Sequence, residues 1–168
     1  MIKIIIWIIG ALITTGLLVL LTGLFLPTER VVQRKSYYKV LPELLFQVVI
    51  NNDDWQYRKS LKDLVMVSRE KNKEIWDEIT KDGAVIRFHT KDKIPFSFYS
   101  FEMDASLFTG TWTGEFESDG EGGTVFTATE YIRVRNPFIK TLSYLFFDVG
   151  KLMDQYQEDL RQKVNNLK

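Results

Sequence analysis

The chain has 168 residues, which is enough for one domain of ordinary size with its own hydrophobic core. It carries 22 basic and 22 acidic side chains, so it lacks the basic surface that a nucleic-acid-binding protein needs. It contains no cysteine, which excludes disulfides, thiolate metal ligands and cysteine nucleophiles. His89 is its single histidine, so any site that requires a histidine pair is excluded as well.

The first segment of the chain is apolar. From Ile4 to Leu26 there is no charged residue, and a helix of that length extends for roughly 34 Å, enough to cross a hydrocarbon core of about 30 Å. A secretory signal peptide has a shorter apolar region and a small-residue cleavage site, which the sequence Gly23-Leu24-Phe25-Leu26-Pro27 does not provide. We therefore expect residues 1–27 to be an uncleaved, single-pass membrane anchor and residues 28–168 to form a domain close to the bilayer.

The sequence leaves the membrane side of this domain open. Lys3 precedes the apolar segment, and four basic residues follow it between Arg30 and Lys39, so positive charges flank both of its ends. Gly16 and Gly23 lie seven residues apart, a spacing that suits either a helix–helix contact or small residues scattered over a lipid-facing helix.

The middle of the chain predicts seven strands. The first is Arg30–Tyr38, followed by a short helix that opens at Pro42 and a second short helical segment at Trp55–Lys59. Turn residues, including Glu70-Lys71-Asn72 and the glycine-rich stretch 118–123, then separate six further strands. These six strands are predicted at residues 61–69, 73–80, 84–90, 95–104, 108–117 and 124–135.

Alternation assigns the faces of the last two strands. One face of each strand is predicted to be the inner, apolar face, and its members are Phe108, Gly110, Trp112, Gly114 and Phe116, then Phe126, Ala128, Glu130, Ile132 and Val134. The opposite face of the sixth strand is polar, as expected for an antiparallel sheet that is covered on one side. Glycines within a strand indicate a bend or a close approach to the backbone.

A long helix is predicted from Asn136 to Leu167. Asn136 suits the N-cap and Pro137 the first helical position. Apolar residues then recur every three or four positions, which predicts one continuous stripe that packs against the sheet. The stripe is Phe138, Leu142, Leu145, Val149, Leu152, Tyr156, Leu160, Val164 and Leu167, widened by Ile139, Phe146 and Met153.

This order of elements resembles the START-like helix-grip superfamily (SRPBCC), in particular its polyketide cyclase/dehydrase and lipid-transport branch. The residues that carry the resemblance are Phe108-Thr109-Gly110-Thr111-Trp112-Thr113-Gly114-Glu115-Phe116, Gly123-Thr124, Thr129-Glu130, Asn136-Pro137-Phe138, and Val40 to Phe46 with Trp55. The resemblance implies an α+β fold in which a curved antiparallel seven-stranded sheet wraps around a long C-terminal helix. In this sequence Tyr57-Arg58-Lys59 replaces a second tryptophan that the family often has.

The same resemblance implies a cavity between the sheet and the helix that binds lipids, sterols or polyketides. With the anchor, it leads us to expect a membrane-tethered domain that binds a hydrophobic small molecule, such as a lipid or isoprenoid. We expect binding more than catalysis, and no cofactor. Two alternatives stay open: a polyketide cyclase/dehydratase-like enzyme, and a packed membrane-tethered module that binds a protein partner.

Glu130 is the candidate ionisable residue, because alternation places its carboxyl group among apolar side chains, where the pKa rises and the group can orient a ligand or transfer a proton. The alternative is a glutamate near the end of the sheet, paired with an arginine. Trp112, Tyr99 and Phe101 are candidates for the cavity wall, with Phe126 beside them. For each aromatic residue, plain core packing is the alternative.

The remaining polar residues favour no reaction. His89 is predicted on the polar side of the sheet, and the spacing of residues indicates no nucleophile–base–orienter set. Glu102 and Asp104 share one strand face but lack further hard ligands for a cation. We therefore predict neither a catalytic residue set nor a metal site.

Overall fold

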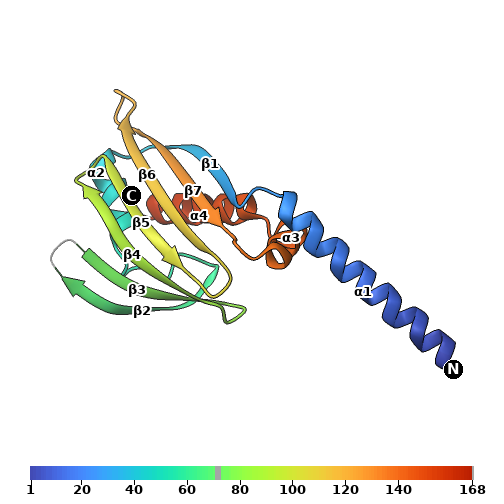
Figure 1. Ribbon diagram of the computed structural model, residues 1–168. Helices are drawn as coiled ribbons and strands as arrows, with labels where there is room; N and C mark the ends of the chain where they lie inside the picture. Colours follow the sequence, from blue (N-terminus) through green and yellow to red (C-terminus); the bar gives the residue numbers. More distant parts are fainter. Residues whose placement is uncertain (71–72, 168) are drawn as a thin grey trace.

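In the computed structural model, which describes residues 1–70 and 73–167, one long helix precedes a curved sheet and two C-terminal helices (Figure 1). The helices are α1 (Ile2–Phe25), α2 (Pro42–Ile50), α3 (Pro137–Phe146) and α4 (Val149–Asn165). The strands are β1 (Glu29–Tyr38), β2 (Leu61–Glu70), β3 (Lys73–Thr80), β4 (Val85–Ile94), β5 (Phe98–Asp104), β6 (Thr109–Ser118) and β7 (Thr124–Arg133).

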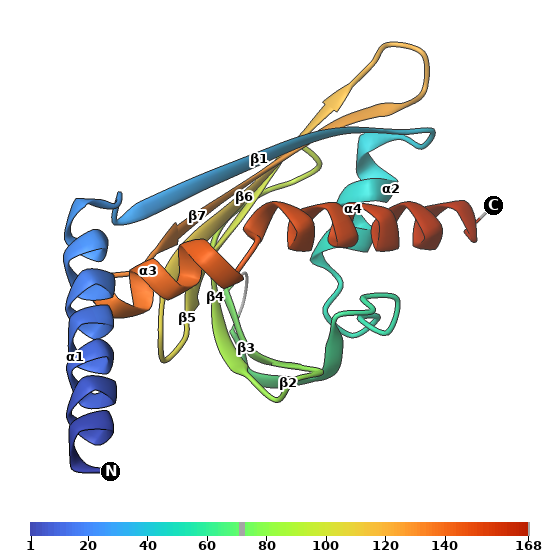
Figure 2. The same ribbon diagram turned by 90° about the vertical axis from the view of Figure 1, so that its right-hand side faces the viewer.

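All seven strands form one antiparallel sheet in the order β1-β7-β6-β5-β4-β3-β2. The sheet curves around α4, which lies on its concave side (Figure 2). The predicted helix-grip fold with seven strands is thereby confirmed. The predicted turn at residues 71–72 lies outside the described residues.

The inner face of the sheet is the one that alternation predicts. Trp112, Phe116, Phe126, Ala128 and Ile132 are each at most 5% exposed. Gly114 lies against the indole of Trp112, whose Cζ3 atom would be 2.9 Å from a Cβ at that position. A glycine inside this strand therefore gives the tryptophan ring room to lie flat on the sheet.

The predicted helical segment at Trp55–Lys59 is wrong, because turns occupy this part of the chain. Two local backbone bonds form there, from the Arg58 amide to the Trp55 carbonyl and from the Leu61 amide to the Arg58 carbonyl, and both span three residues as in turns. The amide of Lys59 donates instead to the Asp159 carboxylate of α4 at 2.8 Å. A tertiary contact thus replaces the helical hydrogen bonding that local sequence suggested.

The predicted helix from Asn136 to Leu167 is interrupted. α3 begins as expected, with the Asn136 side chain accepting from the backbone amides of Phe138 and Ile139. It ends at Phe146, the next residue is extended, and Asp148 starts α4 by accepting from the Lys151 amide. The two helices are therefore separate elements joined by a short extended link, and only α4 lies within the concave sheet (Figure 2).

The break divides the apolar stripe. Val149, Met153, Leu160 and Val164 of α4 are buried against the sheet, as predicted. In α3, by contrast, Phe138, Leu145 and Phe146 are exposed, whereas Ile139 and Leu142 are partly buried. This helix packs on the end of α1 instead of lying within the concave sheet (Figure 2). Gly23 forms part of the α1–α3 contact, whereas nothing lies within 4 Å of a Cβ placed at Gly16.

Candidate functional site

A cavity of about 190 Å³ lies between the inner face of the sheet and α4. Drug-sized ligands occupy sites of roughly 300–1,000 Å³, so this cavity holds part of such a molecule or a smaller one. Its apolar lining includes Leu61, Ile86, Phe88, Phe101, Met103, Phe108, Trp112, Ile132, Phe147, Leu152, Met153 and Tyr156.

One wall of the cavity is aromatic. Trp112 and Phe101 are cross-strand partners on β6 and β5, and their rings stack with centroids 4.9 Å apart and planes 4° apart. Tyr99 packs edge-on against Phe101 at 5.7 Å, and Tyr156 reaches Trp112 from α4 at 6.4 Å. Such paired rings give a rigid apolar surface for a flat or hydrocarbon group.

A buried ion pair forms the polar part of the lining. Arg58 donates through both terminal nitrogens to the two oxygens of Glu78, at 2.6 Å each. Glu78 is 4% exposed and also accepts from the Trp76 indole at 3.0 Å. Burial by itself favours a neutral guanidinium, yet the Glu78 carboxylate raises the pKa of Arg58 above its ordinary value.

Two polar atoms of this region are buried without a hydrogen-bond partner among the described residues: the Arg58 Nε atom and the Tyr99 hydroxyl oxygen. Both residues line the cavity. Buried polar groups are normally satisfied by protein, water or ligand.

Glu130 lies directly opposite Trp112 in the β6–β7 pair and is half-buried in the cavity wall. Burial, with a smaller contribution from the negative charge of Glu78, raises the pKa of its carboxyl group to about 7. Near neutral pH this group is therefore partly protonated, and it can donate a hydrogen bond as well as accept one.

Replacing Glu130 by glutamine is expected to stabilise the protein at pH 8 and to leave its stability unchanged at pH 4. The unfolded chain loses this proton near pH 4.5 and the folded chain near 7, so wild-type stability falls as the pH rises through that window. Ionisation of the buried Glu130 carboxyl group therefore lowers the free energy of unfolding of the wild type by at most about 3 kcal/mol above pH 7. Urea denaturation in detergent at the two pH values measures it.

The matched control for this prediction is Glu117→Gln, at an exposed position of the neighbouring strand β6. It is expected to change stability by less than about 0.5 kcal/mol at either pH. A Glu130→Gln effect of equal size at pH 4 and pH 8 would contradict the raised pKa.

The structure brings four of the five predicted site residues together, since Tyr99, Phe101, Trp112 and Glu130 all line the cavity. Phe126 packs differently: it is fully buried among Tyr38, Trp112 and Phe116 and does not belong to the lining. A role of any of them in ligand binding stays a prediction. Sequence reasoning missed Arg58, Glu78 and Tyr156.

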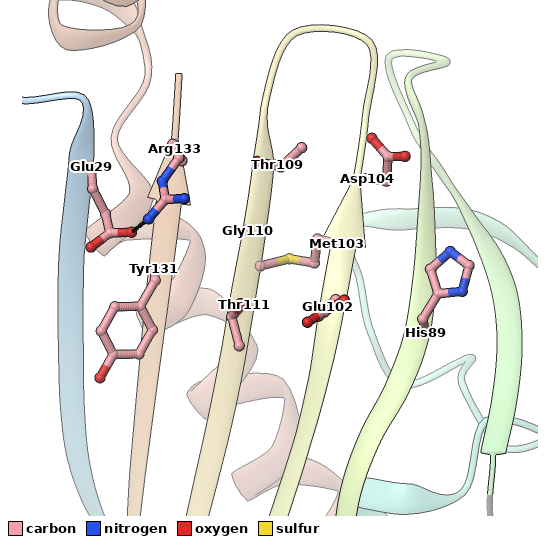
Figure 3. A pocket seen from close by; sticks show the side chains of 10 residues that line it. All are labelled: Glu29, His89, Glu102, Met103, Asp104, Thr109, Gly110, Thr111, Tyr131 and Arg133. Carbon is pink, nitrogen blue, oxygen red and sulfur yellow. Dashed lines mark hydrogen bonds and ion pairs between the residues drawn. The ribbon is translucent and has the colours of Figure 1, made fainter. Parts of the chain in front are cut away.

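A second hollow, of about 490 Å³, lies on the outer face of the sheet (Figure 3). His89, Glu102 and Asp104 border it, and the Glu29–Arg133 ion pair closes one side. His89 is thus on the polar side of the sheet, as predicted.

No group of three or more potential metal ligands gathers anywhere in residues 1–70 and 73–167. The hollow is open and polar, so the inner cavity is the better candidate for an apolar ligand.

No family model and no curated protein matches this sequence, so the likeness to known proteins lies in the fold. The ZhuI aromatase/cyclase from Streptomyces sp. R1128 superimposes with a TM-score of 0.72 at 8% identity, over 82% of this chain and 94% of that one. A START superfamily protein from Mycobacterium smegmatis gives 0.66 at 13% identity, over 82% and 99%. A truncated norcoclaurine synthase from Thalictrum flavum gives 0.66 at 10%, over 81% and 93%.

These similarities define the class of fold. The chain has the START-like helix-grip (SRPBCC) fold, shared with polyketide aromatase/cyclases, START superfamily proteins and norcoclaurine synthase. At such low identity the likeness concerns the fold alone, and function must be argued from the cavity.

Proposed function

We propose that this protein is a single-pass, membrane-anchored START-like domain that binds a hydrophobic small molecule, such as a lipid or isoprenoid, in the cavity between its sheet and α4. The observation that carries the proposal is the cavity itself, with the stacked Trp112–Phe101 wall and the polar groups of Arg58, Glu78 and Glu130 in one lining. A ligand with an apolar body and one polar group matches this arrangement.

The proposed membrane anchor is α1. This helix is long and apolar enough to cross a membrane, and none of the residues in its most apolar stretch is buried. A core helix of a soluble protein passes the same test of length and composition but is buried. Because an apolar surface of this size is costly in water, the exposure of α1 supports a membrane-spanning role.

Native mass spectrometry of the full chain, extracted with its membrane, tests ligand binding. We expect a discrete additional mass that survives detergent exchange, with the lipid class identified from the released ligand. Saturable rebinding of that lipid to delipidated protein is the second readout. A bare protein mass together with no rebinding from any lipid extract would overturn the proposal.

A substitution at the edge of the cavity tests whether the bound lipid occupies this cavity. Leu152 lines the cavity yet is 46% exposed, so tryptophan fits there without strain while its ring occupies part of the space. Leu152→Trp is expected to weaken lipid binding about tenfold, which corresponds to about 1.4 kcal/mol. The adjacent exposed Lys151 does not line the cavity, so Lys151→Trp is the matched control.

A cyclase/dehydratase-like activity is the second candidate, and Glu130 is the observation in its favour. Its carboxyl group lies in the cavity lining and has a pKa near the operating pH, as an acid–base catalyst requires. Glu130→Gln would then abolish turnover while the protein still binds its ligand. Retained turnover in that variant would reject this role.

A further inference from the structure

α3 exposes an apolar face that no described part of the chain covers. Phe138 is 40% exposed, Leu145 66% and Phe146 81%, and we call these three residues the α3 face. Large apolar side chains exposed side by side mark a surface that contacts something other than water. The helix is positioned by α1, to which it is held by hydrogen bonds and by a close backbone contact.

The contact with α1 fixes the level of α3 along that helix. The Thr141 hydroxyl donates to the Val19 carbonyl at 2.7 Å, and the Lys140 Nζ atom donates to the Leu26 carbonyl at 3.1 Å. Seven residues separate Val19 from Leu26, a rise of about 10 Å along α1. The first half of α3 therefore lies beside the last two turns of α1, and not beyond its end (Figure 2).

If α1 crosses a bilayer, the position of α3 along α1 sets the depth of α3 relative to the membrane. The last 10 Å of a spanning helix lies at the boundary between acyl chains and headgroups, where amphipathic helices lie with their apolar side about 5–10 Å deep. The α3 face begins next to the apolar surface of α1, because the first half of α3 packs on α1 and the helix then runs away from it (Figure 2).

The polar groups of α3 are turned away from its apolar face. Lys140 is the only charged residue of the helix; it is 5% exposed and donates to Leu26 and Thr28 at the C-terminal end of α1. This position also places its positive charge at the negative end of the α1 dipole. The Tyr144 hydroxyl donates to the Pro27 carbonyl. The α3 face thus carries no charge that would oppose contact with lipid.

We propose that α3 is an interfacial helix whose face, Phe138, Leu145 and Phe146, docks on the bilayer that α1 crosses. The inference rests on the membrane-spanning role proposed for α1. Phe147 follows directly after α3 and Leu152 lies in the first turn of α4; they are 42% and 46% exposed and line the cavity. Docking therefore turns this edge of the cavity toward lipid, so that an apolar ligand enters from the membrane without crossing water.

Depth-dependent quenching tests the docking. Because the chain contains no cysteine, one environment-sensitive fluorophore can be attached to each of three full-length variants: Phe146→Cys in α3, Leu12→Cys in the middle of α1, and Glu121→Cys in the exposed β6–β7 turn. The proteins are reconstituted in phosphatidylcholine vesicles with nitroxide groups near the headgroup or deep in the acyl chain.

We expect the Phe146 label to be quenched by the shallow nitroxide at least about fivefold more than the Glu121 label, as for an interfacial helix. The Leu12 label should respond most to the deep nitroxide. If Leu12 responds and Phe146 does not, the docking of α3 is overturned while the membrane span stands. If Leu12 does not respond, the membrane span itself is overturned.

A protein occupant of the α3 face gives a different result. The Phe146 label would then be shielded from water, with blue-shifted emission, but would not be quenched by either nitroxide. That outcome also overturns the proposal, and circular dichroism of each labelled variant shows whether its fold is intact.

Discussion

Replacing Arg58 by methionine is expected to lower the free energy of unfolding by about 3–5 kcal/mol at pH 7, the cost of leaving a buried charge without its partner. Glu78 is 4% exposed, and both of its oxygens accept from Arg58. After the substitution the Trp76 indole is the one donor to this carboxylate that remains among the described residues. Urea denaturation of the full chain in detergent, followed by circular dichroism, measures the loss.

Two controls separate this effect from ordinary surface electrostatics. Arg58→Met combined with Glu78→Met removes both charges and is expected to recover most of the lost stability, since buried ion pairs are often no better than apolar residues of similar size. Arg133→Met breaks the pair with Glu29, whose side chains are 51% and 41% exposed, and should cost at most about 1 kcal/mol. Similar losses for Arg58→Met and Arg133→Met would contradict a buried charge at Glu78.

The strands and their inner face were predictable because alternation is a strong local signal. Trp112 and Glu130 were placed on the inner faces of neighbouring strands from the sequence, and in the structure they are direct cross-strand partners. The same rule applies to Trp76 and Glu78 on β3, two residues apart and both buried. Alternation could therefore have identified Glu78 as a second carboxylate facing the core.

Periodicity could not predict the burial of Arg58, because this residue lies in turns between α2 and β2, where no repeating pattern fixes the direction of a side chain. The departure at Tyr57-Arg58-Lys59 from the family pattern was the available signal. A cationic residue needs a partner when it is buried, and Glu78 is the partner of Arg58.

The break between α3 and α4 escaped prediction because apolar residues keep their helical spacing through it. Leu145, Val149 and Leu152 continue one stripe, although the chain is extended at Phe147. The signal present was Asp148, a good N-cap that accepts from the Lys151 amide. Moreover, a stripe shows that a helix has an apolar side, and it does not show which neighbour covers that side.

Replacing Gly23 by alanine is expected to separate α3 from α1, while Gly16→Ala leaves the protein unchanged. A Cβ atom at Gly23 would collide with the backbone carbonyl of Pro137 and lie 2.8 Å from the Thr141 hydroxyl oxygen. A backbone group cannot rotate away, so the helices must move apart, and the Thr141–Val19 hydrogen bond lengthens. At Gly16 the new methyl group meets nothing within 4 Å.

Hydrogen exchange of the full chain in lipid nanodiscs measures this separation. Overpacking of this kind costs about 1–3 kcal/mol, so amides of α3 should exchange roughly 5- to 160-fold faster in Gly23→Ala than in wild type or Gly16→Ala. Amides of α4 should keep their protection, because Asp148 caps that helix independently and the sheet covers it. Equal exchange of the α3 amides in the two glycine variants would show that α1 does not hold α3 in place. The argument that the edge of the cavity lies at the membrane would then fail, because it depends on that contact.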